Sequence, residues 1–444
     1  MSSHFPHQLI LFGPPGTSKS YRAKNVKAAA LEAEGDCLVP VAFHPEFSYG
    51  EFVARLLPMT KGSKIEYTVH AGPFLRALAE AYFQISVAAE KQAAKVVLLI
   101  DEINRGNCAE IFGDVFHLLD RDDDGWSSYE IHVSDLVIGA LEGLFAANRL
   151  QRQEYDKRVL QLLDSKKLRL PPNLYLLGTM NTSDESIFYM DSAFKRRWNF
   201  EFCPASFADV PDFQRDARVC ENPPLAWQGF IDALNVWITN ECTVPKLDDK
   251  LVGPWFVKAK ALPTSPLSGS YPAELADLGA LGAKVAEQYK GPGHSDEFDD
   301  ALLSFAKARS AKVQARIYKF GKYTASGPRK FQAIASVPAT ISKRYFYVSR
   351  KSGIPIPTDT MRIEDFLDGL DTVPIDEWTH EIPRADIVGK LFLYLWDNVF
   401  DRDKRPLEDL LGVKRKDLRT FGQFADLVDS FIEKLLAYDA KQKS

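Results

Sequence analysis

The octapeptide Gly13–Ser20, with the sequence GPPGTSKS, most constrains what this chain can fold into. It follows the short apolar run 9–12 and precedes a stretch of helical composition that ends near Gly35. A strand, a glycine-rich turn and a helix in this order predict a phosphate-binding loop, in which backbone N–H groups and the helix N-terminus face the phosphates. Residues 8–120 read as alternating strands and helices, so we expect an α/β fold with a parallel sheet and helices on its faces.

The last side chains of this loop suit a triphosphate bound together with a metal ion. Lys19 would neutralise charge on the β- and γ-phosphates, and Ser20 would place its hydroxyl on Mg²⁺. Ser18 stands where the usual pattern has a second glycine; because serine tolerates the dihedrals of a helix entry, we expect a small local change and retained binding. A glycine turn without a ligand is the weaker alternative. The predicted nucleotide-binding residues are Gly13, Pro14, Pro15, Gly16, Thr17, Ser18, Lys19 and Ser20.

Two carboxylates follow the apolar run 96–100, which reads as a buried parallel strand. Asp101 suits the Mg²⁺ shell, usually through water, and Glu102 suits a general base that takes the proton of an attacking water. An apolar run that ends in Asp-Glu is weak evidence alone, but it is strong evidence downstream of a phosphate loop. We therefore expect Ser20 and Asp101 to hold Mg²⁺ as the cofactor and Glu102 to be catalytic.

A third strand-like run, 174–178, is followed closely by Met180-Asn181-Thr182-Ser183-Asp184. With the two segments above, it resembles the AAA+ superfamily, and the segment 101–105 looks like the branch that holds MoxR-type chaperones and McrB-type restriction NTPases. The similarity to the McrB type is carried by Phe43-His44-Pro45, Gly72-Pro73-Phe74 and the segments 178–184 and 190–198. The resemblance covers roughly residues 8–258 and weakly resumes at 387–411.

The resemblance implies roles for further residues. Asn181 would act as sensor 1 at the γ-phosphate or the attacking water, and Asp184 would help Glu102 to orient that water. Arg196 or Arg197 would reach a neighbouring subunit's site as an arginine finger, a group worth ~10³–10⁵ in rate. The alternatives are a strand-end Asx turn at Asn181 and Asp184, and a solvated helix end at the two arginines.

The chain is long enough for two or three domains. We expect an AAA+ nucleotide-binding core at 1–205, the first part of a helical lid at 206–261, a mixed α/β insertion at 262–383 and the C-terminal part of the lid at 384–444. Gly253-Pro254-Trp255-Phe256 resembles a family motif of the lid. No arginine near this motif clearly fits the usual sensor-2 role.

The net charge of −5 gives no global argument for nucleic acid, but the distribution of charge does. Twelve Lys and Arg and no Asp or Glu lie between Lys307 and Lys351, interleaved with aromatic residues. Such a surface could contact phosphates and stack on unpaired bases, with Arg329, Lys330, Lys343 and Arg344 as the candidate DNA contacts. The alternatives are contact with the acidic flanks of this island or another subunit, and a plain solvated face.

Composition also bounds the location of the protein. No apolar run reaches ~18 residues, so no transmembrane helix and no membrane partner are expected. The first residues lack the basic and apolar regions of a signal peptide. Five scattered cysteines form no close pair of metal-ligand type, which predicts reduced thiols in a cytoplasmic protein.

The leading hypothesis is an AAA+ nucleoside triphosphatase that uses ATP or GTP. By resemblance it would form a homo-oligomeric ring, usually a hexamer, and act as the motor or switch of a McrBC-like DNA restriction system in host defence. Cleavage would then belong to a separate McrC-like nuclease subunit. The alternatives are a MoxR-like protein-remodelling chaperone and a nucleotide-gated DNA-binding adaptor without motor activity.

Overall fold

The computed structural model describes residues 5–61, 64–88, 91–147, 150–181, 188–220, 225–261 and 380–442. The chain divides into two compact units. One comprises residues 1–210, 228–257 and 384–444, and the other comprises 211–227 and 258–383. The basic island 307–351, with Arg329, Lys330, Lys343 and Arg344, lies outside the described residues. The mixed α/β character of the insertion and the four-part division of the chain therefore stay predictions.

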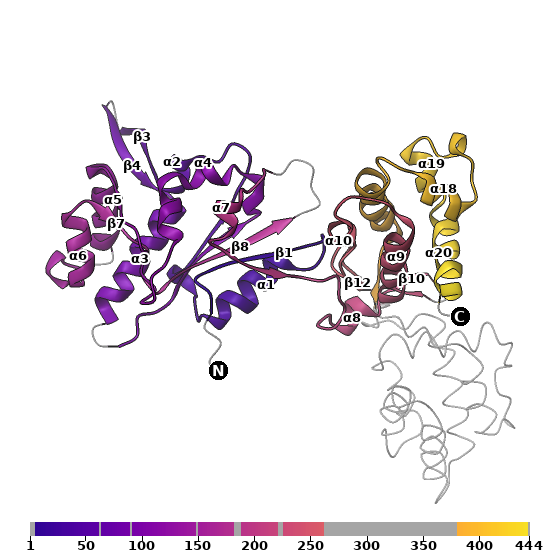
Figure 1. Cartoon of the computed structure of the whole chain (residues 1–444), viewed down its shortest axis with the longest axis horizontal. Coiled ribbons are helices and arrows are strands. Elements are labelled where there is room, and N and C mark those ends of the chain that lie inside the picture. The colour runs from indigo at the N-terminus through magenta and orange to yellow at the C-terminus, as the bar shows by residue number, and fades with distance from the viewer. Residues whose placement is uncertain are drawn as a thin grey trace, which may run out of the picture. The chain divides into compact units, whose positions relative to one another are not determined.

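A five-stranded parallel sheet forms the centre of the first unit (Figure 1). The strand order is β2 (Leu38–Ala42), β5 (Val96–Asp101), β8 (Leu174–Asn181), β1 (Gln8–Gly13) and β9 (Asn199–Phe202). Every neighbouring pair is parallel, so all five carboxyl ends meet at one edge, where ligands of open α/β sheets bind. The predicted α/β phosphate-loop fold is confirmed.

Both faces of this sheet are covered, which explains the apolar runs of its strands. On one face Ile10, Leu98 and Leu176 pack in the cluster that holds α3 (Pro73–Ala88). On the other face Leu11, Leu99 and Leu177 pack against residues of η1 (Ala23–Ala28), which continues α1 (Lys19–Arg22). Neighbouring residues of one strand thus enter different cores, as the two-residue repeat of a strand requires.

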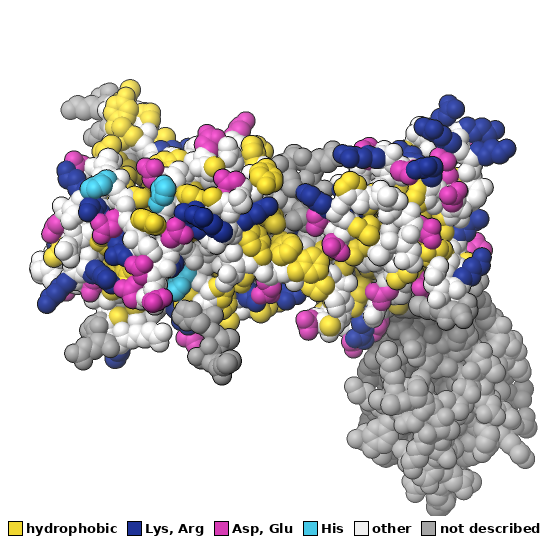
Figure 2. Space-filling model, viewed as in Figure 1, with side chains coloured by type: hydrophobic (Ala, Val, Ile, Leu, Met, Phe, Trp, Pro, Cys, Tyr) yellow, Lys and Arg dark blue, Asp and Glu magenta, His cyan; other side chains and the backbone are white. Residues whose placement is uncertain are grey.

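An antiparallel hairpin interrupts the predicted alternation of strands and helices. After η2 (Gly35–Cys37), β2 and α2 (Tyr49–Phe52), the chain forms β3 (Ala54–Lys61) and β4 (Lys64–Ala71), which pair with each other alone. The sequence analysis missed this hairpin, although Gly62 and Ser63 between two β-prone runs are a hairpin signal. Leu56, Ile65 and Tyr67 are exposed on it, and the apolar group at the upper left of Figure 2 lies over it.

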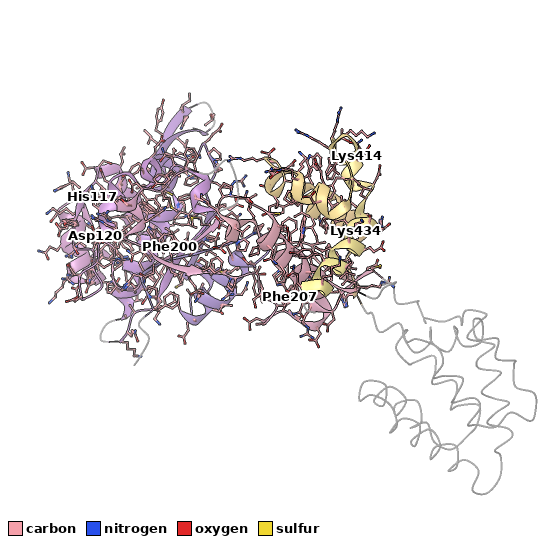
Figure 3. All side chains as sticks on the ribbon, turned by 45° about the vertical axis from the view of Figure 1, so that its right-hand side comes forward. His117, Asp120, Phe200, Phe207, Lys414 and Lys434 are labelled. Carbon is pink, nitrogen blue, oxygen red and sulfur yellow. The ribbon has the colours of Figure 1, made fainter. Side chains whose placement is uncertain are left out.

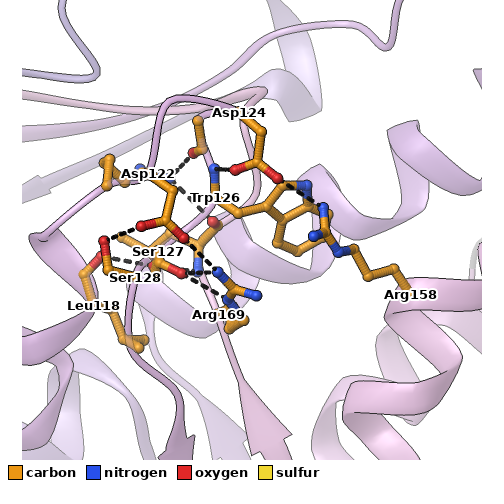
Figure 4. A network of polar contacts seen from close by, with 11 residues as sticks. Leu118, Asp122, Asp124, Trp126, Ser127, Ser128, Arg158 and Arg169 are labelled. Atoms are coloured by element: carbon orange, nitrogen blue, oxygen red, sulfur yellow. Dashed lines mark hydrogen bonds and ion pairs between the residues drawn. The ribbon is translucent and has the colours of Figure 1, made fainter.

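An insertion precedes β8. It follows η3 (Ile103–Arg105), α4 (Cys108–Phe112) and η4 (Gly113–Leu119), and it contains β6 (Ile131–His132), α5 (Asp135–Ala147), η5 (Arg152–Glu154), α6 (Lys157–Asp164) and β7 (Lys167–Leu168). Figure 4 shows the polar network that ties its first turn to its return strand: Arg169 Nε donates to the Ser127 carbonyl at 2.7 Å, and Arg158 pairs with Asp124 at 3.1 Å.

Arg121, in the same turn, donates to the carbonyls of Gly125, Leu170, Pro171 and Leu174 at 2.9–3.1 Å. Burial lowers the pKa of its guanidinium to about 9. These contacts fix where the chain re-enters the sheet.

The helices of the predicted lid come from segments that are far apart in the sequence. They are α9 (Trp227–Glu241) and α10 (Leu247–Lys250), then α17 (Arg384–Asp386), η7 (Ile387–Phe392), η8 (Leu395–Val399), α18 (Arg405–Leu411), η9 (Arg415–Asp417), α19 (Phe421–Ala425) and α20 (Val428–Gln442). Their core is aromatic: the rings of Phe392 and Phe424 stack 4.5 Å apart, and Trp237 of α9 meets Phe400 and Phe431.

In the second unit, the described residues form α8 (Asp212–Arg215) and a small sheet of four short strands. The order in this sheet is β11 (Leu225–Ala226), β10 (Arg218–Cys220), β13 (His380–Glu381) and β12 (Lys260–Ala261). Across the described parts of both units, no helix combines the length and the apolar character needed to cross a membrane. All five cysteines are free thiols, as predicted.

Candidate nucleotide-binding site

The loop after β1 has a backbone that only glycine adopts easily at two points. Gly13 has φ 145° and Gly16 has φ 78°, and a Cβ on Gly13 would lie 2.4 Å from the Cys203 carbonyl oxygen. The side chain of Lys19 folds over the loop, and its Nζ donates to the carbonyls of Gly13 at 2.9 Å and Pro14 at 2.8 Å. Lys19 is 7% exposed, so its ammonium group is already held where phosphates are expected.

Ser18 does not have helix-entry dihedrals. Its φ of 61° and ψ of 30° lie in the left-handed region, and it directly precedes α1. The expected backbone at this position was therefore wrong, and the usual glycine has a physical reason here. A non-glycine residue in this region costs about 1–2 kcal/mol, and such strain is common at functional sites.

Ser20, in α1, and Asp101, the last residue of β5, are the two predicted metal ligands, and the fold brings them together. Ser20 Oγ donates to Asp101 Oδ1 at 2.7 Å. Thr179, near the end of β8, donates to the same oxygen and accepts a hydrogen bond from the Glu102 amide at 3.1 Å. The sequence analysis missed Thr179; its signal was a small hydroxyl side chain directly after the apolar run 174–178.

This donor set fits Mg²⁺. A hydroxyl and a carboxylate are hard oxygen ligands, and Mg²⁺ is commonly held by one or two such groups together with phosphates and waters. Within the described ranges no cluster of three or more His, Cys, Asp or Glu side chains could hold a metal. The fit therefore depends on Ser20 and Asp101 with a phosphate ligand.

Glu102 lies directly after β5 in a left-handed backbone conformation, with φ 53° and ψ 47°. Its Oε2 accepts a hydrogen bond from Arg105 Nη1 at 2.6 Å, a contact that the sequence analysis did not foresee. The short turn 103–105 brings this arginine back to Glu102. Glu102, predicted as the general base, thus lies at the carboxyl edge of the sheet, with its carboxylate held by its own turn.

Asn181 is the last residue of β8 and lies beside Gly13 in the register of β1 and β8. This pairing places the predicted sensor 1 next to the first glycine of the phosphate loop. Asn104 Nδ2 donates to the Asn181 carbonyl at 2.5 Å, and Asn104 itself is 2% exposed. Asn104 was also missed by the sequence analysis. Asp184 lies outside the described residues.

Arg196 and Arg197, at the end of α7 (Ser192–Lys195), have different surroundings. Arg197 Nη2 pairs with Asp120 Oδ2 at 2.7 Å (Asp120 is labelled in Figure 3), and its guanidinium lies 3.9 Å from the centre of the Phe116 ring. The Arg197 side chain is only 6% exposed. Arg196 is exposed, and no described residue pairs with its guanidinium.

Comparison with known proteins gives one family and two relatives. Residues 8–124 match the family of AAA domains described as the dynein-related subfamily. Over 282 residues the chain is 28% identical to the Type II restriction enzyme BsuMI component YdiS of Bacillus subtilis, covering 58% of this chain and 74% of that protein. Over 207 residues it is 27% identical to the Type IV methyl-directed restriction enzyme EcoKMcrB subunit of Escherichia coli, covering 46% of this chain and 37% of that protein.

Proposed function

Since the chain belongs to the McrB-type AAA+ proteins, we propose that it hydrolyses ATP or GTP with Mg²⁺ and serves a DNA restriction system. The observation that carries this proposal is the meeting of Lys19, Ser20 and Asp101 at the carboxyl edge of the parallel sheet. The Ser20–Asp101 hydrogen bond of 2.7 Å joins residues 81 positions apart. A bare glycine turn would not need this arrangement of cation, hydroxyl and carboxylate.

The residues of the site divide the work of phosphoryl transfer. Lys19 would exchange the carbonyls of Gly13 and Pro14 for β- and γ-phosphate oxygens, and the N–H groups of the loop would bind the remaining oxygens. Ser20 and Asp101 would hold Mg²⁺, which supplies charge neutralisation on the phosphates. Glu102 would accept the proton of the attacking water after its carboxylate leaves Arg105.

Asn181 and Asp184 would complete this site on the side of the attacking water. The register that places Asn181 beside Gly13 supports its contact with the γ-phosphate or this water. Asp184 follows three residues later and is proposed from the sequence alone.

A second protomer would complete the site with Arg196. An exposed guanidinium without a partner in the described part of its own chain suits a role in trans, whereas Arg197 is held by Asp120. Tyr189, which precedes α7, is also exposed (86%), so the surface around Arg196 is open to a second protomer. We therefore propose a homo-oligomeric ring, a hexamer in its expected form, with Arg196 as the arginine finger.

The restriction role comes from the two relatives, whose names are those of restriction enzyme components. A McrC-like nuclease subunit is proposed as the partner, since the described residues hold no cluster of metal-ligating carboxylates. Arg329, Lys330, Lys343 and Arg344 are proposed to contact DNA, on the evidence of their sequence alone.

The test is equilibrium binding of fluorescent ATP and GTP analogues with and without Mg²⁺. We expect micromolar or tighter binding of at least one nucleotide, a loss of at least about tenfold in Lys19→Ala, and no change in the exposed-surface control Lys157→Ala. A wild-type chain that binds neither nucleotide, alone or with its partner subunit, would contradict the proposal.

A further inference from the structure

The segment Gly253–Phe256, which follows α10 in the first unit, lies directly on the phosphate loop. The Gly253 amide donates to the Pro15 carbonyl at 2.9 Å, and the Trp255 amide donates to the Gly16 carbonyl at 2.8 Å. The Phe256 amide returns to the Gly253 carbonyl at 3.1 Å and closes a turn. Two main-chain donors of the lid are therefore paired with two consecutive carbonyls of the loop.

The two backbone segments lie too close together for a side chain at Gly16 or at Gly253. A Cβ on Gly16 would lie 2.5 Å from the Phe256 amide nitrogen. A Cβ on Gly253 would lie 2.4 Å from the Gly16 carbonyl carbon and 2.7 Å from the Thr17 nitrogen. Because the obstructing atoms are backbone atoms, no side-chain rotation relieves such a clash. Glycine at both positions lets main chain meet main chain.

The direction of these carbonyls fixes the direction of the amides behind them. In a trans peptide the C=O and the following N–H lie in one plane and point opposite ways. With Pro15 O and Gly16 O turned toward the lid, the N–H groups of Gly16 and Thr17 point to the other side of the loop. Lys19 holds the two preceding carbonyls, of Gly13 and Pro14, so each carbonyl from Gly13 to Gly16 accepts a hydrogen bond.

Side chains from two other parts of the predicted lid hold the segment in place. The side-chain amide of Asn235, on α9, accepts from the Val252 amide at 2.8 Å and donates to the Val252 carbonyl at 2.9 Å. The Phe256 ring packs on Tyr394, with ring centroids 4.9 Å apart. Tyr394 Oη in turn lies 3.3 Å from the Lys250 carbonyl. The segment is thus fixed to both halves of the lid.

We propose that residues 252–256 form a main-chain clamp that orients the Gly16 and Thr17 N–H groups toward the triphosphate and couples the lid to nucleotide occupancy. The clamp stands where a sensor-2 arginine was sought in the sequence, and it performs the coupling through the loop instead of through a charged side chain. The proposal rests on the proposed nucleotide binding. Because coupling is reciprocal, bound nucleotide strengthens the contact between the clamp and the loop by the same factor by which the clamp strengthens binding.

The variant that tests the clamp is Gly253→Ala, with Gly389→Ala as the matched control. A Cβ on Gly389, in η7 of the same lid, would meet nothing within 4 Å. We expect Gly253→Ala to bind Mg²⁺-nucleotide about tenfold more weakly, as the loss of two hydrogen bonds predicts, and Gly389→Ala to bind like the wild type. Thermal unfolding without nucleotide shows whether each variant is folded. A folded Gly253→Ala that binds nucleotide as tightly as the wild type overturns the clamp.

Hydrogen exchange in the wild-type chain tests the proposed clamp even if Gly253→Ala does not fold. Mass spectrometry of the peptides that cover 251–257 and 13–22 is compared with and without Mg²⁺-nucleotide. We expect both peptides to exchange at least tenfold more slowly when nucleotide is bound. Protection of 13–22 without any change at 251–257 contradicts the clamp and leaves nucleotide binding intact. A chain that binds no nucleotide contradicts the proposed function itself.

Discussion

At the residue scale, Arg196 and Arg197 show how neighbours of identical chemistry can have different surroundings. The guanidinium of Arg197 is removed from water, paired with Asp120 and packed on Phe116. Removing one partner of such a pair leaves the other uncompensated, which costs more than the pair itself contributes. Arg196 has no such contact in the described part of its chain, so its removal should spare the fold.

We predict opposite effects for substitution of these two arginines. Arg197→Ala should lower the free energy of unfolding by about 2 kcal/mol, less than for a fully buried pair because Asp120 is a third exposed. Arg196→Ala should change stability by less than about 0.5 kcal/mol but reduce turnover by about 10³ with nucleotide affinity retained. Lys195→Ala is the control for a nearby exposed cation. Chemical denaturation measures the stability of each variant, and steady-state assays measure its turnover. A stability loss in Arg196→Ala together with a turnover loss in a stable Arg197→Ala would refute the assignment.

Ser18 gives a second prediction at this scale. Ser18→Gly removes the left-handed strain of about 1–2 kcal/mol but adds backbone freedom to the unfolded chain, which offsets about half of it. We expect a net gain of about 0.5 kcal/mol in stability and unchanged nucleotide affinity. Ser18→Val should be less stable than the wild type and bind nucleotide more weakly, because a β-branched residue is strongly disfavoured at positive φ. Equal stability of the glycine and valine variants would show that φ 61° is not maintained in solution.

At the element scale, the parallel sheet explains why distant residues meet. Gly13, Asp101 and Asn181 each end a strand, and the register of β1, β8 and β5 brings these ends to one edge. The hairpin β3–β4 takes no part in that sheet and leaves Leu56, Ile65 and Tyr67 exposed. The sheet thus builds the site, while the hairpin is an addition to it.

The start of α18 carries a pH-dependent contact. Three hydrogen bonds from the Arg405 side chain, aided by its backbone amide, lower the pKa of Asp403 to about 2. A carboxyl with a lowered folded pKa stabilises the fold above its unfolded pKa of about 3.9 and loses that contribution as pH falls toward 2. Because the pair is at the surface, solvent screening keeps this contribution small.

We therefore predict that Asp403→Asn flattens the loss of stability between pH 4 and pH 2. The control is Asp409→Asn, an exposed carboxyl within α18. Thermal unfolding across this pH range makes the comparison. If thermal stability falls with pH equally steeply in the wild type and in Asp403→Asn, the predicted role of this contact is contradicted.

At the scale of the whole molecule, the sequence predicted those features that local pattern determines. The phosphate loop, the strand before Asp101 and the α/β class follow from short motifs and apolar runs. Thr179, Arg105 and Asn104 were not foreseen, because their importance arises from strand register and from a turn that returns on itself. The dihedrals of Ser18 were misjudged because the tertiary fold, rather than serine's own preference, sets them.

The basic island yields a prediction about the assembled protein. If Arg329, Lys330, Lys343 and Arg344 contact phosphates, their joint replacement by Ala should weaken DNA binding across sequences and reduce the salt slope by about 4. The matched control replaces four cations outside the island, Lys91, Lys157, Lys195 and Lys434. Fluorescence anisotropy at several salt concentrations measures the slope, and an unchanged slope would remove the island from DNA binding.

The central claim is that a triphosphate is split at the edge where Lys19, Asp101 and Glu102 meet. Phosphate release from ATP and GTP, measured for the wild type, Glu102→Gln and the exposed control Glu110→Gln, tests it most directly. The account predicts turnover by the wild type and by Glu110→Gln, and a loss of about 10²–10⁴ in Glu102→Gln with nucleotide still bound. Phosphate release that is equal in all three proteins would contradict it.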